Sequence, residues 1–320
     1  MASHKKHDPQ TLLLPTHHAT GVERRVTEDS LSKCNLQEDS PLFAVLPAEL
    51  RTTIFELATQ PYDDPSHPYK EEDYYYRPGH HTKPKTDTAL LLTCRLIWLE
   101  TNHLPLHQSC PTFWFKAEER RPEWTRRAPV LGSRYSLRRP KTRWITEEER
   151  YKRFMAGLTA QNGENLREMR FFGQLAWLES WQLTYLLSST QPIPPRIVVT
   201  VRHTDWWWWE NDSALAMDIE WIWRLLKFNS GVRKAREFVL ELETLDFKVD
   251  HLFKGIVEGI QKECGEIEGW VLQDGAGKEV SEWTGPATIG GRAWVPYVSR
   301  TELRYKLFSL VWKRQEDESR

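Results

Sequence analysis

The chain has 320 residues, of which 39% are hydrophobic, 28% are charged and 16 are tryptophan, and its formal net charge is −1. This balance fits an ordinary globular core with polar segments and excludes a partner that is held by overall charge alone. Four scattered cysteines without a Cys-x-x-Cys pair predict neither a zinc site nor a disulfide framework, and no apolar run approaches the roughly 20 residues of a membrane span. We expect an intracellular protein of the cytoplasm or nucleus, without a signal peptide.

Residues 1–40 are polar and lack any hydrophobic periodicity, which predicts a disordered tail. The tail carries four histidines, but no cysteine or acidic frame accompanies them, so we expect solvated side chains and no metal site. These histidines are His4, His7, His17 and His18.

Residues 41–115 predict a helical element around which the rest of the chain is organised. In its first helix Leu50, Ile54, Leu57 and Ala58 recur along one face, and Pro47 suits the first turn. Residues 87–102 predict a second helix, which Asp87 can cap. Its stripe consists of Leu90, Cys94, Ile97 and Trp98.

Two motifs of this element, Leu-Pro-Ala-Glu-Leu at 46–50 and Leu-Leu-Thr-Cys-Arg at 91–95, resemble the F-box. The form they resemble is a divergent one, from uncharacterised proteins of filamentous fungi. The resemblance returns in patches at 100–106, 112–115, 203–210 and 237–244. In ordinary F-boxes the helices follow closely, whereas residues 60–86 separate them here. The resemblance implies that a Skp-type adaptor contacts Leu46, Pro47, Leu50, Ile54, Leu57 and Leu92.

Two stretches without hydrophobic periodicity interrupt the predicted helices and strands. Residues 60–86 predict a long inserted loop with acidic and tyrosine side chains, either a functional loop or a variable insertion. Residues 116–145 predict a basic linker, because 120–143 hold eight Arg and one Lys against the single Glu123. No nucleic-acid-binding fold surrounds this linker, so we do not expect a nucleic-acid partner. An alternative is that it lies against the acidic residues within 63–73.

Residues 146–312 predict an α/β body, which opens with a capping box from Thr146 to Glu149. Strands near 169, 197 and 237 alternate with helices, which indicates a mostly parallel sheet. A hairpin between 270 and 283, a strand at 294–298 and a helix beginning at Ser299 follow, before a charged tail at 313–320. The predicted fold class is α+β: F-box-like helices, an irregular α/β layer with a mostly parallel sheet, and a C-terminal β-hairpin and helix.

Candidate catalytic residues are few, since the chain has no Gly-x-Ser-x-Gly elbow and no phosphate loop. His203 and Asp205 follow a predicted parallel strand, where α/β enzymes often place active groups. We favour the alternative that Asp205 caps a turn and that His203 bonds to backbone, because the pair lacks a third partner. Glu241 and Glu243 are expected to be solvated.

Four consecutive tryptophans, Trp206, Trp207, Trp208 and Trp209, cannot all enter one core, so we expect some to anchor the sheet and others to contact a partner. The sequence as a whole predicts a non-enzymatic protein–protein interaction module without cofactor or metal. The resemblance to the F-box implies that this module is a substrate receptor of a Skp-cullin-F-box ubiquitin ligase, with an unidentified target. The alternatives are a scaffold whose F-box-like helices are only structural, and a hydrolase-like enzyme using His203 and Asp205.

Overall fold

The computed structural model describes residues 34–117, 120–121, 146–211, 213–293 and 301–315. The chain divides into two units, residues 1–34 and 35–320, and only Cys34 of the first is described. Outside the described part lie residues 1–33 of the predicted tail (1–40), the basic linker apart from residues 116, 117, 120 and 121, the predicted strand at 294–298 and the last five residues. The fold below is that of the second unit.

Four parallel strands form one half of the sheet, from the edge strand inward, and are adjacent in space in the order in which they occur in the chain. Their runs of Val, Ile, Leu and Phe are almost entirely buried, as expected for strands covered on both faces. The predicted mostly parallel sheet is therefore confirmed. The four strands are β3 (Thr112–Phe115), β4 (Glu168–Gly173), β5 (Arg196–Val201) and β6 (Glu237–Leu245).

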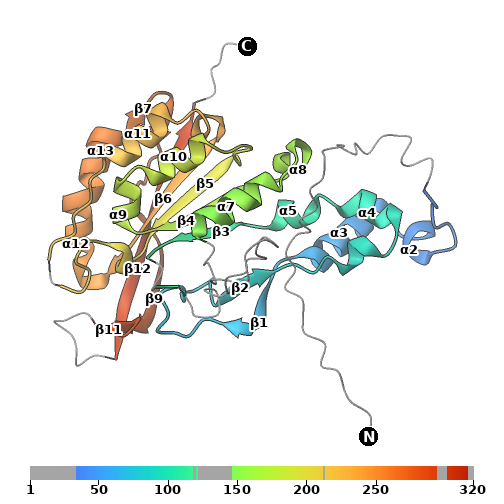
Figure 1. Cartoon of the computed structure of the whole chain (residues 1–320), viewed down its shortest axis with the longest axis horizontal. Coiled ribbons are helices and arrows are strands. Elements are labelled where there is room, and N and C mark those ends of the chain that lie inside the picture. The colour runs from blue at the N-terminus through green and yellow to red at the C-terminus, as the bar shows by residue number, and fades with distance from the viewer. Residues whose placement is uncertain (1–33, 118–119, 122–145, 212, 294–300, 316–320) are drawn as a thin grey trace, which may run out of the picture. The chain divides into compact units, whose positions relative to one another are not determined.

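Helices between the strands cover one face of the sheet, as Figure 1 shows for α9–α13. Phe113 and Phe171, neighbours across β3 and β4, both contact Tyr151 of α7 on this face. The predicted capping box at Thr146 and Glu149 begins α7. The helices are α7 (Glu147–Ala156), α8 (Ala160–Glu164), α9 (Leu175–Glu179), α10 (Gln182–Ser188), α11 (Glu220–Phe228), α12 (Val249–Leu252) and α13 (Glu258–Cys264), with short helical turns at η3 (His203–Asp205), η4 (Val232–Lys234), η5 (Asp246–Lys248) and η6 (Phe253–Val257).

The C-terminal strands complete the sheet through β12 (Glu302–Arg314), which pairs antiparallel with β6 on one side. On its other side β12 pairs antiparallel with β9 (Lys278–Pro286), which forms the C-terminal strand hairpin. The hairpin predicted between 270 and 283 is wrong in detail, because β8 and β9 each pair with β12 along its length. The remaining strands are β7 (Glu266–Ile267), β8 (Trp270–Leu272), β10 (Thr288–Ile289) and β11 (Arg292–Ala293). The α+β class is confirmed.

The helix predicted from Ser299 is wrong, because residues 302–314 form β12. Leu303, Leu307 and Leu310 are spaced as on a helix, but Leu303, Tyr305 and Leu307 also alternate as in a strand, and all three are buried. Local capping signals are therefore overridden by long-range pairing with β6 and β9.

Residues 69–81 pack on the second face of the sheet, and the prediction of a loop over 60–86 is wrong for the residues on either side of them. This segment forms an antiparallel pair of strands, β1 (Tyr62–Pro68) and β2 (Thr82–Lys85), joined by residues 69–81. We call residues 69–81 the arm. Its Tyr69, Tyr74 and Tyr75 are buried in the main core, and Figure 1 shows β1 and β2 across the sheet from the helices.

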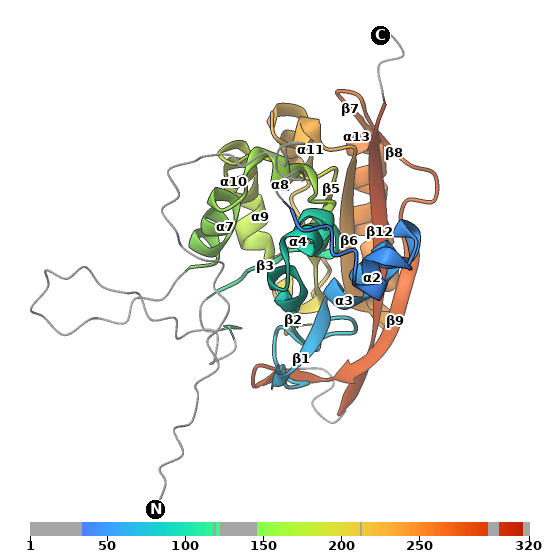
Figure 2. The ribbon, with the colours of Figure 1, turned by 90° about the vertical axis from the view of Figure 1, so that its right-hand side faces the viewer.

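The helical element consists of α2 (Pro41–Ala44), α3 (Ala48–Thr59), η1 (Ala89–Leu92), α4 (Arg95–Thr101) and α5 (Leu104–Gln108). Figure 2 views it from its own side of the molecule. The predicted helix at 87–102 is broken at Cys94, whose Sγ accepts a hydrogen bond from Ile97 N and caps α4. Asp87 instead caps the turn before it, because its Oδ1 accepts from Ala89 N at 2.8 Å.

Candidate functional site

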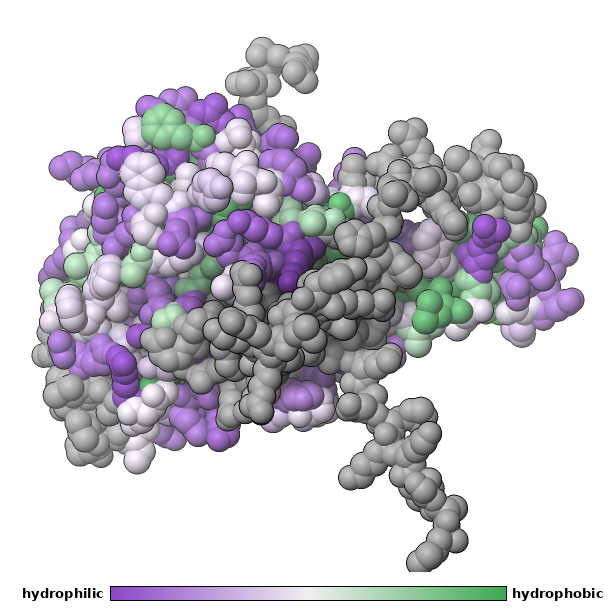
Figure 3. All heavy atoms as spheres, viewed as in Figure 1, coloured by the Kyte–Doolittle hydropathy of each residue, from purple (hydrophilic) through white to green (hydrophobic). Residues whose placement is uncertain are grey.

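The apolar stripe predicted on α3 faces solvent. Leu50, Ile54 and Leu57 are exposed, whereas Arg51, Phe55 and Thr59 form the inward face of the same helix. Leu92 on η1 is 84% exposed and Leu50 is 53% exposed. Of the six residues implied by the resemblance, Pro47 is also exposed and Leu46 is half-buried. Figure 3 shows hydrophobic side chains among hydrophilic ones on the visible side of this element.

The helical element has a hydrophobic core of its own, separate from that of the sheet. Phe55, Ile97 and Leu104 are its buried centre. Leu42, Phe43, Leu90 and Cys94 pack around that centre. The outward stripe of α3 is therefore not used to pack the element together.

Polar contacts fix the three main helices of this element to one another. Arg51 donates through Nη2 to Glu100 Oε1 at 3.2 Å and through Nη1 to Leu46 O at 2.9 Å, which ties α3 to α4 and to the turn before α3. Gln108 Nε2 donates to Glu56 O at 2.9 Å, and Thr59 Oγ1 donates to Gln108 Oε1. The inserted residues 60–86 thus leave α3 and α4 in direct contact, because the insertion folds away onto the sheet.

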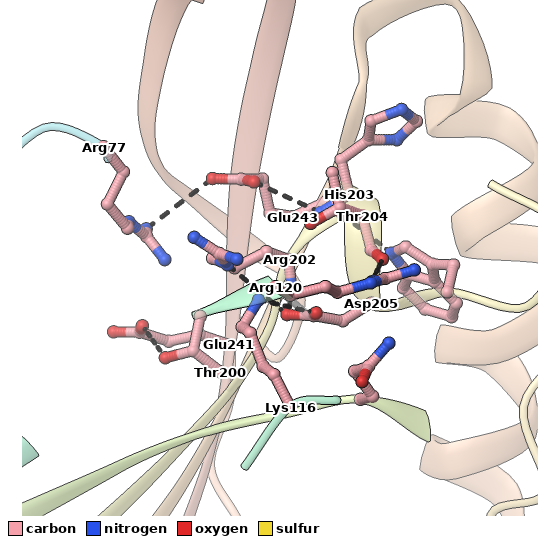
Figure 4. Close-up of polar contacts among 12 residues, drawn as sticks. Arg77, Lys116, Arg120, Thr200, Arg202, His203, Thr204, Asp205, Glu241 and Glu243 are labelled. Carbon is pink, nitrogen blue, oxygen red and sulfur yellow. Dashed lines mark hydrogen bonds and ion pairs between the residues drawn. The ribbon is translucent and has the colours of Figure 1, made fainter. Parts of the chain in front are cut away.

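A second set of polar residues is buried where the arm meets the ends of the parallel strands (Figure 4). The Lys116 and Asp205 side chains form an ion pair of 2.7 Å and are both fully buried. Arg202 Nε donates to the other oxygen of Asp205 at 3.3 Å, and Arg120 Nη1 donates to Thr204 O at 2.7 Å. Burial raises the pKa of the Asp205 carboxyl, and the charges of Arg202 and Arg120 act against that rise.

Glu243 on β6 joins the arm to this cluster. Its carboxylate lies 3.7 Å from Arg77 Nη2, accepts from His203 N at 3.2 Å and accepts from Trp283 Nε1 at 3.3 Å. Its neighbour Glu241 accepts from Thr200 Oγ1 and Arg170 Nη1, both at 2.7 Å. The expectation that Glu241 and Glu243 are solvated is wrong, because both are buried.

Aromatic rings lie beneath these charges on the same face of the sheet. Tyr75 of the arm stacks on Trp114, and Trp114 stacks on Phe172, with centroids 4.3 Å and 3.9 Å apart. The Arg77 and Arg202 guanidinium groups both lie over the Phe172 ring. Such contacts offset part of the cost of burying the cations, so the cluster holds the arm in place.

His203 and Asp205 are adjacent in sequence but are not brought together as a catalytic pair. Among the described residues the ring nitrogens of His203 have no hydrogen-bond partner, and its ring packs edge-on against Trp209 and Tyr305. Burial, reinforced by the Lys248 ammonium, lowers the pKa of His203 to about 3. Asp205 caps the turn as predicted, since its Oδ2 accepts from Arg202 N. The prediction that the His203 ring bonds to backbone is wrong.

The four consecutive tryptophans are divided between core and surface, as predicted. Trp206 and Trp209 are buried, and Trp206 Nε1 donates to Glu243 O at 2.8 Å. Trp207 and Trp208 are exposed, at 42% and 68%. The tryptophans thus anchor the end of β5 and also present two indoles to solvent. That these two contact a partner stays a prediction.

The buried cluster was missed in the sequence analysis. One signal was present: two carboxylates in a strand that is otherwise apolar suggest buried cations opposite them. The partner of Glu243, Arg77, lies 166 positions before it in a segment without periodicity, so no spacing rule could have paired the two.

Comparisons of the chain with protein-family models, with curated proteins and with solved structures give no match. In the described part of the chain no three His, Cys, Asp or Glu side chains are grouped as a metal site would require. No helix among those residues has the length and apolar character needed to cross a membrane.

Proposed function

We propose that the helical element, residues 41–108, docks on a Skp-type adaptor and that the α/β body holds a protein to be ubiquitinated. The protein then acts as a non-enzymatic substrate receptor in the cytoplasm or nucleus. The observation that carries this proposal is the outward apolar stripe of α3, Leu50, Ile54 and Leu57, together with the exposed Leu92.

The first support is energetic. A leucine or isoleucine side chain gains about 1.5–3 kcal/mol when it moves from water into an apolar environment. The inward face of α3 uses Phe55 for this purpose, while three large aliphatic side chains of the same helix stay in contact with water. Clustered apolar side chains of this kind mark interaction surfaces more often than isolated ones do.

The second support is preorganisation. Arg51, Glu100 and Gln108 fix the helices relative to one another, so that the stripe does not need to be assembled when a partner binds. A surface that is already ordered loses less conformational entropy on association. The insertion between the two F-box-like motifs does not weaken this support, because α3 and α4 remain packed together.

The test measures binding of the purified protein to a purified fungal Skp-type adaptor by isothermal titration calorimetry. We expect the wild-type protein to bind and Leu50→Asp to abolish binding, because the interface would bury an unpaired carboxylate. The matched control is Tyr185→Asp, which places the same charge on an exposed helical position of the body, in α10. Thermal melts establish that both variants fold.

Two results would overturn the proposal. One is a wild-type protein that does not bind the adaptor at micromolar concentrations. The other is equal loss of binding in Leu50→Asp and Tyr185→Asp. If Leu50→Asp does not fold, Leu92→Asp is measured in its place, since Leu92 is more exposed than the three residues of the α3 stripe.

A further inference from the structure

A second exposed aromatic surface lies on the α/β body, apart from the helical element. Trp207 and Trp208 follow the turn after β5, and Trp181 precedes α10. The two segments are joined directly, because Trp207 Nε1 donates to Glu179 Oε2 at 2.7 Å, two residues before Trp181. All three indoles are exposed.

Two of these tryptophans have a strained backbone. Trp181 has φ = 67° and Trp208 has φ = 54°, in the left-handed region that bulky residues rarely adopt. Burial in the core does not account for this strain, since Trp181 is 46% exposed and Trp208 is 68% exposed. Strain that holds a large exposed side chain in place is more typical of a binding surface than of a core.

The side chains beside these rings carry more negative than positive charge. Glu220 pairs with Arg224, and Glu210 pairs with Arg292. Within the described residues Glu179 and Asp218 form no ion pair, and the Glu179 Oε1 atom accepts only from Asp218 N. The ammonium of Lys248 is buried beneath the loop and donates to the carbonyls of Asn211 and Ser213.

The same surface already holds one guanidinium against an indole. The Arg224 Cζ atom lies 3.5 Å from the centre of the Trp181 ring, while its guanidinium pairs with Glu220. An indole face and an adjacent carboxylate together make a favourable site for a planar cation. The same two components are supplied by Trp207, Trp208, Glu179 and Asp218, beside which no cation is placed among the residues that the structure describes.

We propose that this aromatic–acidic surface (Trp207, Trp208, Glu179 and Asp218) binds an arginine-containing basic segment of a partner protein. An apolar partner would bury Glu179 and Asp218 without compensation, which disfavours it. An acidic partner would meet like charge. The inference stands apart from adaptor docking, because no residue of the helical element takes part in it.

The experiment uses the full chain and a fluorescein-labelled peptide of nine arginines, with fluorescence anisotropy as the readout. We expect binding of this peptide and none of a nine-glutamate peptide. Trp208→Gly should weaken binding by about tenfold, the effect of losing one cation–π contact. It should also raise the urea midpoint of unfolding, because glycine relieves the strain at φ = 54°.

Glu179→Gln keeps the acceptor for Trp207 Nε1 but removes the charge, so it should weaken binding and reduce its dependence on salt. Two control variants, Tyr62→Ala and Glu266→Gln, remove an exposed aromatic ring on β1 and an exposed carboxylate on β7, and both should bind as the wild type does. The proposal is overturned if the arginine peptide does not bind, or if the control variants lose as much affinity as Trp208→Gly and Glu179→Gln.

Discussion

Lys116 Nζ lies 2.7 Å from Asp205 Oδ1, and neither side chain has any exposed surface. The pair joins the residue that follows β3 to the turn that follows β5. Asp205→Asn leaves the buried Lys116 without its counter-ion and should lower the free energy of unfolding by about 3–5 kcal/mol. Lys116→Met should cost less, because Asp205 keeps its ion pair with Arg202.

The double variant Lys116→Met/Asp205→Asn should lose less than the sum of the two single losses, because it leaves no unpaired lysine. Urea melts measure all three variants. Lys152→Met, which breaks the exposed pair with Glu148, is the control and should leave the melt almost unchanged. Strictly additive losses in the double variant would mean that the ion pair contributes nothing of its own.

The buried His203 and the half-buried His80 predict a pH dependence of stability. The pKa of His203 is lowered to about 3 by burial and by Lys248, with Asp205 opposing, and burial and Arg77 lower the pKa of His80 to about 3. The unfolded chain, with a His pKa near 6.5, binds protons that the folded state excludes. Their stabilising contribution is therefore complete above about pH 6.5 and is lost as the pH falls toward 3.

Each of these histidines should contribute up to about 1.4 kcal/mol per pH unit to that loss. Urea melts between pH 7 and pH 5, above the range in which most carboxylates titrate, should show a smaller slope in His203→Gln than in the wild type. His251→Gln, on the surface of α12, is the control and should keep the wild-type slope. An unchanged slope in His203→Gln would contradict the buried, neutral His203.

The division of the tryptophans predicts two classes of alanine variant. Trp206→Ala and Trp209→Ala should each cost about 3–5 kcal/mol, the usual range for truncating a large core side chain. Trp207→Ala and Trp208→Ala should stay within about 0.5 kcal/mol of the wild type, because their rings are exposed. Denaturant melts of the four single variants measure this. Similar large losses in all four would mean that the exposed pair is part of the core in solution.

Alanine substitutions at two neighbouring glycines in the turn between β10 and β11 test whether the arm packs against that turn. Gly290 and Gly291 both have positive φ, 58° and 76°, but a Cβ at Gly290 would lie 1.9 Å from the Tyr74 ring and one at Gly291 would meet nothing within 4 Å. Gly290→Ala should thus cost about 1–3 kcal/mol more than Gly291→Ala in urea melts, which is the usual cost of overpacking. Equal costs would indicate that Tyr74 does not pack against this turn.

Much of the body could be predicted from the sequence, because β4, β5 and β6 are apolar runs separated by helical patterns. The division of the tryptophans followed from sterics alone. The arm could not be predicted, since its buried residues Tyr75 and Arg77 are specified by partners on β3, β4 and β6 far along the chain. The strand β12 was predicted as a helix because its leucines fit both periods and only its pairing with β6 decides between them.

The position of β12 has a consequence for the order of events during synthesis. Its partner strands β6 and β9 are made before residues 302–314 leave the ribosome, and β6 then has an open edge on which Leu240 and Leu242 belong to the core. Open, apolar strand edges pair readily with other chains. The nascent body is therefore exposed to aggregation until β12 arrives, and protection by a chaperone would matter most during that interval.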